Sequence, residues 1–260
     1  MASRIGLNPK LRGSKGRGFN RALPAPFGFD KGLRPNGTSM YFMVPGFVGK
    51  YINTPMAFEF WTKITSTYNY SWAAMKFNYP SYNMRFAVDA RGGAAVQGVL
   101  GQGTEFINGL NHVVAWFDPI TGDIGSISNA NASGYKVRLN NESVLQFSQY
   151  PVSLLHVNTD VSTTETNPFP MDEFRIYNRI LSFSEVTTNY NNGVGANPCT
   201  TEDLLVWYKF EKFEMLDFST LQDGSGFQLG MRDHSGNNNH GIPINMDTNP
   251  SSPTYVLQLF

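Results

Sequence analysis

The stretch Met171–Val186, MDEFRIYNRILSFSEV, carries the clearest secondary-structure signals in this chain. Its first half alternates apolar and polar residues, with Phe174 and Ile176 on one side of an extended backbone. The alternate positions would face the opposite side, and these are Glu173, Arg175 and Tyr177. The pattern predicts a strand that packs one face on a core.

The second half of the stretch carries a helix start signal. Ser182 and Glu185 have the capping-box spacing, in which each side chain satisfies a backbone N–H of the other residue. The triplet Asn191-Asn192-Gly193 then tolerates the left-handed backbone that ends a helix. We therefore expect a short helix over residues 183–190. The side chains expected to pack it are Phe183, Val186 and Tyr190.

Short β-branched and aromatic runs, separated by turn signals, extend over much of the remaining chain. The expected strands lie within residues 39–52, 56–67, 84–90, 112–118 and 135–139. Strands at this spacing predict an all-β fold, an antiparallel two-sheet sandwich with one short helix. The residues expected in or near its core are Trp61, Trp116, Ile176, Trp207 and Phe210.

The composition supports an all-β fold. Aromatic residues make up 14% of the 260 residues and charged residues only 15%, with 25 Gly and 15 Pro. Long Ala/Glu/Lys/Leu-rich stretches are missing, which argues against a helix bundle, and the large apolar content argues against disorder over most of the length. No apolar run approaches the roughly 18 residues of a membrane span.

Several motifs resemble one fold family. Met171–Val186 is similar to the closing strand and helix of concanavalin A-like, laminin G-like jelly-roll domains. Leu204–Phe210, LLVWYKF, and Met231–Gly241, MRDHSGNNNHG, resemble the W-Y-x-F strand and D-x-S-G-N turn of that family. Asn111–Asp118, NHVVAWFD, resembles a further strand, with Asn where the family carries Trp. The resemblance implies a jelly-roll sandwich.

The likeness covers about residues 39–245. The W-Y-x-F and D-x-S-G-N motifs come first in many relatives, but here they follow the D-E-x-R-I-Y-N-R strand, as in a circular permutation. We expect an extended arm over residues 1–38 and one jelly-roll domain over residues 39–260, with closing strands after residue 197.

The turn around Asp233 has a structural and a functional interpretation. Its Asp and Ser favour a local turn, and Gly236 and Asn237 tolerate positive φ. A salt bridge of Arg175 or Arg179 with Asp172 or Asp233 would fit the neighbouring strand. A structural role is favoured over a functional one for both the strand of residues 172–177 and the turn of residues 233–237.

Relatives of this fold often bind Ca²⁺, so we also consider a calcium site. Oxygen donors of suitable hardness are Asp233, Asn237 and Asn239, with Asp223 as a further candidate. One or two carboxylates are few for an ion that gathers six to eight oxygens. Calcium is therefore a weak candidate, and no other cofactor is expected.

The motifs of an enzyme are missing. Retaining glucanases on this fold need two carboxylates about 5 Å apart in one groove. Glu59 stands alone in sequence, and the adjacent Asp172 and Glu173 should point to opposite strand faces. Cys199 is the single cysteine and has no His near it in sequence. The four histidines show no metal-binding spacing: His112, His156, His234 and His240. We expect no catalytic activity.

The zero net charge hides a basic arm and an acidic body. Residues 1–29 contain six basic groups and no acid, which leaves 14 basic and 20 acidic groups in the rest. Gly and Pro interrupt this arm every few residues, so it should be extended when alone. The residues expected to hold a partner are Arg4, Lys10, Arg12, Lys15, Arg17, Phe19, Arg21, Phe27 and Phe29. The apolar members favour a protein partner over nucleic acid.

Two non-enzymatic functions fit these features. The first is a structural protein of a bacteriophage virion, assembled in the host cytoplasm and anchored by its arm to the major capsid protein or other head proteins. The architecture looks like that of auxiliary capsid or head-associated proteins of crAss-like phages. No signal peptide is visible at the N-terminus, which fits assembly in a cytosol.

The alternative is a carbohydrate-binding, lectin-like module for cell-surface or gut glycans. One aromatic stretch could stack on sugars through Tyr68, Tyr70, Trp72, Tyr79 and Tyr82. The competing interpretation is that these rings belong to the core or to an interface, which is the more common role.

Deletion of residues 1–30 tests the anchoring hypothesis. The truncated protein should stay soluble and folded but should no longer join its assembly, because apolar anchors in the arm hold the complex. Co-sedimentation at low and high salt measures this. Incorporation of the truncated protein at full occupancy would show that the arm plays no part.

Overall fold

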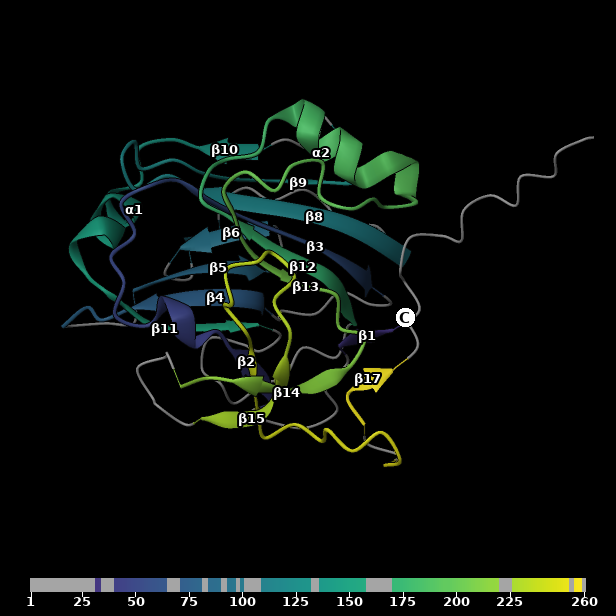
Figure 1. Ribbon diagram of the computed structural model, residues 1–260. Helices are drawn as coiled ribbons and strands as arrows, with labels where there is room; N and C mark the ends of the chain where they lie inside the picture. The colour runs from purple at the N-terminus through teal and green to yellow at the C-terminus, as the bar shows by residue number, and fades with distance from the viewer. Residues whose placement is uncertain are drawn as a thin grey trace, which may run out of the picture.

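The structure is a computed structural model, and it describes residues 31–33, 40–64, 71–80, 84–89, 93–96, 99–100, 109–131, 136–157, 170–219, 226–252 and 255–258. Two antiparallel sheets pack face to face, with helix α2 lying across the outer side of the first (Figure 1). The predicted all-β two-sheet sandwich is confirmed.

The first sheet contains eight strands and is centred on β3 and β12. Its order along the main path is β10 (Lys136–Arg138), β9 (Ile124–Ser128), β8 (Gly109–Phe117), β3 (Met56–Ile64), β12 (Met171–Tyr177), β1 (Gly32–Leu33) and β17 (Leu257–Gln258). Strand β13 (Leu204–Tyr208) also pairs with β12.

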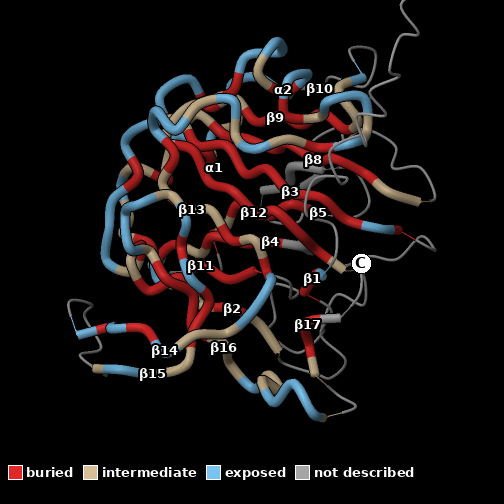
Figure 2. The backbone as a smooth tube through the Cα atoms, turned by 45° about the vertical axis from the view of Figure 1, so that its right-hand side comes forward, coloured by how far each residue is buried: buried red, intermediate tan, exposed pale blue. Residues whose placement is uncertain are grey.

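The second sheet contains seven strands. Their order is β16 (Ile242–Ile244), β2 (Tyr41–Met43), β11 (Val152–Val157), β4 (Ser71–Phe77), β5 (Arg85–Asp89), β6 (Gly93–Val96) and β7 (Val99–Leu100). A separate two-stranded hairpin, β14 (Phe213–Asp217) with β15 (Phe227–Met231), projects from the body (Figure 2).

Aromatic rings fill the space between the sheets. Phe58 of β3 lies fully buried, 5.1 Å from Phe86 of the second sheet and 6.3 Å from Phe174 of β12, measured between ring centroids. Phe77 and Phe147 stack at 4.3 Å. Pairs at these separations add to the burial free energy of the rings themselves, and the Phe58–Phe86 pair joins the two sheets.

A second, smaller core lies on the outer face of the first sheet. Helix α2 (Phe183–Tyr190) buries Val186 there against Trp116 and Tyr177 of the sheet. Both faces of β3 are therefore covered, and eight of its nine residues are buried. The outer face of β3 therefore buries Ala57, Trp61 and the charged Glu59, while its inner face is almost entirely apolar.

The helix has the predicted bounds and capping box, and it ends at Asn191 with φ 44°. Its packing differs in one respect. Phe183 is 48% exposed, so the prediction that it packs the helix was wrong, and Asn189 is buried instead. A second short helix, α1 (Glu142–Leu145), was not predicted, and 3-10 turns lie at Pro45–Phe47, Gln146–Gln149 and Asn191–Gly193.

Four of the five predicted core residues are buried: Trp61, Trp116, Ile176 and Phe210. Trp207 is half-buried beside the smaller core. The first sheet begins earlier than expected, because Gly32–Leu33 form β1 against β12 within the segment assigned to the arm. The arm residues 1–30 lie outside the described residues, and no described helix is long and apolar enough to cross a membrane.

Phe58→Ala tests the main core. The loss of a fully buried ring should lower the free energy of unfolding by about 3–5 kcal/mol. Urea denaturation measures this. Phe183→Ala is the matched control, since its exposed ring should leave stability within about 0.5 kcal/mol. Equal losses in the two variants would contradict the placement of these rings.

Candidate functional site

A buried ionic cluster lies between the first sheet and helix α2. The Glu59 carboxylate of β3 is 0% exposed. Its Oε1 lies 2.7 Å from Nε2 of His112, and its Oε2 accepts hydrogen bonds from Arg175 Nη1 at 3.2 Å and Tyr177 Oη at 3.0 Å. Asn189 of α2 donates to the same Oε2 at 3.1 Å. The carboxylate thus ties the helix to the sheet.

The second half of the cluster centres on Arg175. Its Nη2 donates to Glu173 Oε2 at 3.0 Å and to the carbonyl of Ala196 at 2.6 Å. The register of β12 shifts between Asp172 and Arg175, and Glu173 has φ 53°. This bulge aims Glu173 at the indole Nε1 of Trp207, which donates to it.

The electrostatics show that Glu59 is ionised. Burial raises the pKa of Glu59, but Arg175, His112 and Asn189 outweigh it and bring the pKa from 4.5 to about 2. Burial raises the pKa of Glu173 more than Arg175 and Trp207 lower it. A buried charge of this kind persists only with close partners, which fits a structural cluster.

Glu59 stands alone in sequence, but the fold brings it to Glu173, and the two carboxylates share Arg175. The salt bridge expected between an arginine of this strand and Asp233 is not formed among the described residues, because Arg175 pairs with these two glutamates and Arg179 pairs with Glu185 and Asp203. Sequence spacing could not show the Glu59–Arg175 pair, since 116 residues separate its members.

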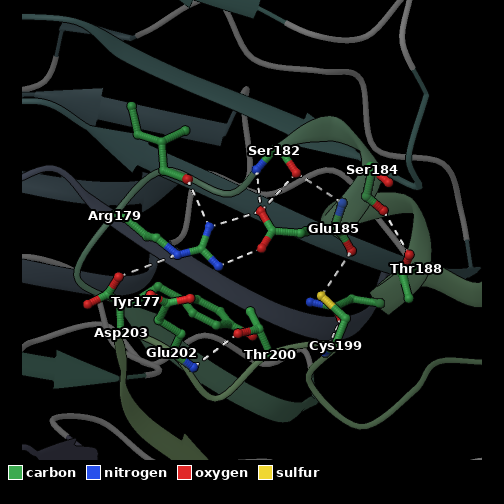
Figure 3. Close-up of polar contacts among 12 residues, drawn as sticks. Tyr177, Arg179, Ser182, Ser184, Glu185, Thr188, Cys199, Thr200, Glu202 and Asp203 are labelled. Atoms are coloured by element: carbon green, nitrogen blue, oxygen red, sulfur yellow. Dashed lines mark hydrogen bonds and ion pairs between the residues drawn. The ribbon is translucent and has the colours of Figure 1, made fainter.

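Arg179 holds the junction between β12 and α2 (Figure 3). Its two terminal nitrogens donate to the two carboxylate oxygens of Glu185, and its Nε lies 3.7 Å from Asp203 Oδ2. Ser182 completes the capping box: its N–H donates to Glu185 Oε2 at 2.8 Å, and its Oγ accepts from the Glu185 backbone N–H at 3.3 Å. The Arg179 guanidinium therefore pairs with Glu185 and Asp203, and the motif serves as a structural lock.

Cys199 lies next to this lock. Burial and then Glu185 raise the pKa of its thiol, and its backbone N–H donates to Asn189 Oδ1 at 2.8 Å. A thiol with a raised pKa is a poor nucleophile at neutral pH. The geometry supplies no activating base for it among the described residues.

The turn after β15 covers the open edge of β13. Both oxygens of Asp233 accept hydrogen bonds, from the Trp207 and Ser235 N–H groups at 2.9 Å and from the Ser235 hydroxyl and the Asn239 N–H at 2.8 and 2.9 Å. Asn237 and Asn239 donate their side-chain amides to the β13 carbonyls of residues 204 and 205. The turn thereby protects an edge strand.

This geometry bears on the proposed calcium ligands Asp233, Asn237 and Asn239. Four protein donors already occupy the Asp233 carboxylate, and Asp223 lies outside the described residues. Among the described residues no group of three His, Cys, Asp or Glu side chains could hold a metal. The turn interpretation is therefore the better supported one.

One predicted sugar-stacking residue, Tyr79, lies in an aromatic group at one end of the second sheet. Its ring meets Tyr150 edge to face with centroids 4.7 Å apart. Hydrogen bonds place residues 49–52, 150–152 and 78–79 side by side: Val152 N to Lys50 O at 2.8 Å and Asn78 N to Pro151 O at 2.9 Å. Tyr51, which is 56% exposed, therefore lies in the segment beside that of Tyr150. We call Tyr51, Tyr79 and Tyr150 the tyrosine platform.

The other predicted stacking residues are not described. Tyr68, Tyr70 and Tyr82 lie outside the described residues, and of Trp72 only the backbone, in β4, is described. Sequence analysis missed Tyr51 and Tyr150, because the backbone hydrogen bonds that place their segments beside that of Tyr79 join parts far apart in the chain.

Comparisons with known proteins give remote similarities of fold. No family model and no curated protein match the chain. Among solved structures, a candidate carbohydrate-binding protein from Bacteroides ovatus has a TM-score of 0.49 at 13% identity, covering 82% of this chain and 57% of that one.

Two further structures are similar at 14% identity. The sialidase CBM40 of Ruminococcus gnavus bound to sialyllactose has a TM-score of 0.41 and covers 61% of this chain and 95% of its own. The extracellular region of zebrafish Gpr126 has a TM-score of 0.48, with 78% and 26% coverage. At these identities the similarities assign no activity, ligand or partner to the chain.

Glu59→Gln tests the buried cluster. Removal of the charge leaves Arg175 incompletely paired, which should cost about 3–5 kcal/mol of unfolding free energy at pH 7. Because folding lowers the pKa of Glu59 from 4.5 to about 2, its contribution is present above pH 4.5 and is lost as the pH falls toward 2. Wild type should therefore lose more stability than Glu59→Gln over this range.

Urea midpoints from pH 7 to pH 2 measure both effects. Glu214→Gln is the control, because its ion pairs with Arg232 and Lys212 lie at the surface and should contribute at most about 1 kcal/mol. Parallel pH curves for wild type and Glu59→Gln would contradict the ionised, buried state of Glu59.

Calcium and chelator tests distinguish the two interpretations of the Asp233 turn. Neither Ca²⁺ nor EDTA should change the Tm, since protein donors occupy the carboxylate, whereas Asp233→Ala should cost about 1–3 kcal/mol by leaving the Trp207 N–H unpaired. Thermal scans measure both. A Tm that rises with Ca²⁺ in wild type but not in Asp233→Ala would restore the metal site.

Proposed function

We propose that this chain is a non-enzymatic carbohydrate-binding domain that holds its ligand on the tyrosine platform. The observation that carries the proposal is the edge-to-face pair of Tyr79 and Tyr150, with the exposed Tyr51 one segment away. Tyrosine offers a sugar an apolar ring for its C–H face and a hydroxyl for its polar edge.

The platform is also rigid and flanked by polar groups. Tyr79 and Tyr150 pack against the main core, which fixes their rings before a ligand arrives. Asn78 and Lys50, both exposed, come from the same side-by-side segments and can hydrogen-bond sugar hydroxyls. Few, well-placed polar groups around aromatic rings are the usual composition of a small-ligand site, and preorganisation lowers the entropic cost of binding.

A hydrolytic role has less support. Glycoside hydrolysis needs one carboxyl group as acid and another as nucleophile or base, both in contact with the substrate. Glu59 and Glu173 converge on Arg175, and they are only 0% and 2% exposed. Glu185 and Asp203 converge on Arg179, which pairs with both of them. Their arrangement supports a folding role, so the proposed domain binds without cleaving.

Attachment to a virion is a second candidate function. A basic segment of charge +6 precedes a body of charge −6, which favours docking of the arm on an acidic protein surface. The arm lies outside the described residues, so this function is tested by the arm deletion and not by the platform.

Alanine substitution of the platform tests sugar binding. Wild type should bind members of a glycan array, and Tyr51→Ala should weaken the best glycan at least tenfold, or about 1.4 kcal/mol, by removing the exposed ring. Tyr79→Ala should weaken it further, and calorimetry measures both affinities.

Phe227→Ala is the control for loss of an exposed ring, because Phe227 is 71% exposed on the separate β14–β15 hairpin. It should leave affinity unchanged. An array with no bound glycan, or equal affinities for wild type and Tyr51→Ala, would refute the proposal.

A further inference from the structure

A second exposed aromatic group lies on the outer face of the first sheet. Lys209 follows β13, and its Nζ lies 4.5 Å from the ring centroid of Trp207. His234 meets the same indole edge to face, with centroids 5.9 Å apart. His234 is exposed, whereas Trp207 and Lys209 are half-buried. Three side chains from two segments thus converge at the surface.

Lys209 and His234 have polar groups that the described residues leave unused. The neighbouring cations are neutralised: Arg232 and Lys212 pair with Glu214, and Arg175 pairs with Glu59 and Glu173. Lys209 forms no ion pair with any described residue. The side chain of His234 likewise has no hydrogen-bond partner in the described part of the chain.

The positive charge of Lys209 affects the pKa values of His234 and Glu173. Burial lowers the pKa of His234 and the Lys209 ammonium lowers it further, which together outweigh the opposite effect of Glu211. The same ammonium lowers the pKa of Glu173, although burial, the larger effect, raises it. At neutral pH His234 therefore offers a neutral ring N–H beside an unpaired ammonium.

Trp207 is held rigidly between these groups. Its indole Nε1 donates to Glu173, its backbone N–H donates to Asp233, and its carbonyl accepts from the His234 N–H at 2.8 Å. The indole is therefore held in place, with the Arg175 guanidinium 5.5 Å and the Lys209 ammonium 4.5 Å from its ring centroid and His234 in edge-to-face contact. Such preorganisation is what a binding site for a small anion requires.

We propose that Trp207, Lys209 and His234 form a binding site for the carboxylate of an acidic sugar, separate from the tyrosine platform. The carboxylate bridges the Lys209 ammonium and the His234 ring N–H, and the sugar ring lies against the exposed part of the indole. The same turn carries Asn238, an exposed amide suited to a sugar hydroxyl. An aromatic ring and an amide beside the cation favour a sugar acid over a simple anion.

Chemical-shift titration of the ¹⁵N-labelled full chain tests this site, with D-glucuronate as the probe and D-glucose as its neutral counterpart. Glucuronate should shift the Trp207 indole N–H, assigned by its absence in Trp207→Phe, and glucose at the same concentration should not. Lys209→Met should weaken the response at least tenfold, and His234→Ala should weaken it as well. Lys212→Met is the matched control, because that lysine is 70% exposed and pairs with Glu214.

Three results would overturn the proposal. Equal responses to glucose and glucuronate would show that the carboxylate is not recognised. An equal response to acetate would show that the sugar plays no part. An unchanged response in Lys209→Met would remove the ammonium from the site. Tyr51→Ala should not alter the titration, so failure here is distinguishable from failure of the platform.

Discussion

The charge of Arg175, held between Glu59 and Glu173 without access to solvent, is the interaction on which the outer half of the molecule depends. Each ion would be costly to bury alone, and the cluster is tolerable only because every member finds partners. The partners of the Glu59 carboxylate come from β8, β12 and α2, so the requirement to satisfy this one buried charge of β3 fixes how four elements meet. The apolar contacts around α2 could hold the helix in several positions, whereas the hydrogen bonds select one.

The same cluster reaches the surface through Trp207. Its indole N–H donates to Glu173, while the Asp233 turn holds its backbone. An edge strand with both attachments is protected from pairing with another chain. The position of Trp207 at the surface therefore depends on the buried Glu173. The Leu204–Phe210 and Met231–Gly241 motifs, which resemble those of jelly-roll families, meet at this residue.

Sequence patterns predicted what depends on local spacing. The capping box defined α2 to the residue, and alternation in β12 placed Phe174 and Ile176 in the core and Glu173, Arg175 and Tyr177 opposite. Sequence patterns did not predict contacts between residues that lie far apart in the chain. Glu59 and Arg175, or Tyr79 and Tyr150, meet only through strand pairing, and the bulge at Glu173 has no sequence signal of its own. Local patterns also failed to predict which side of α2 is buried. Asn189 is buried because it donates a hydrogen bond to Glu59, whereas the Phe183 ring remains exposed.

The distance along the chain between Glu59 and Arg175 has a consequence for biosynthesis. The ribosome delivers β3 and β8 long before β12, so Glu59 must stay hydrated until its cation emerges 116 residues later. Burial of an unpaired carboxylate is costly, so the apolar inner face of β3 and its outer Trp61 stay uncovered until β12 is made. Non-local pairing of this kind folds slowly. The nascent chain is thus most in need of chaperone protection between the synthesis of β3 and that of α2.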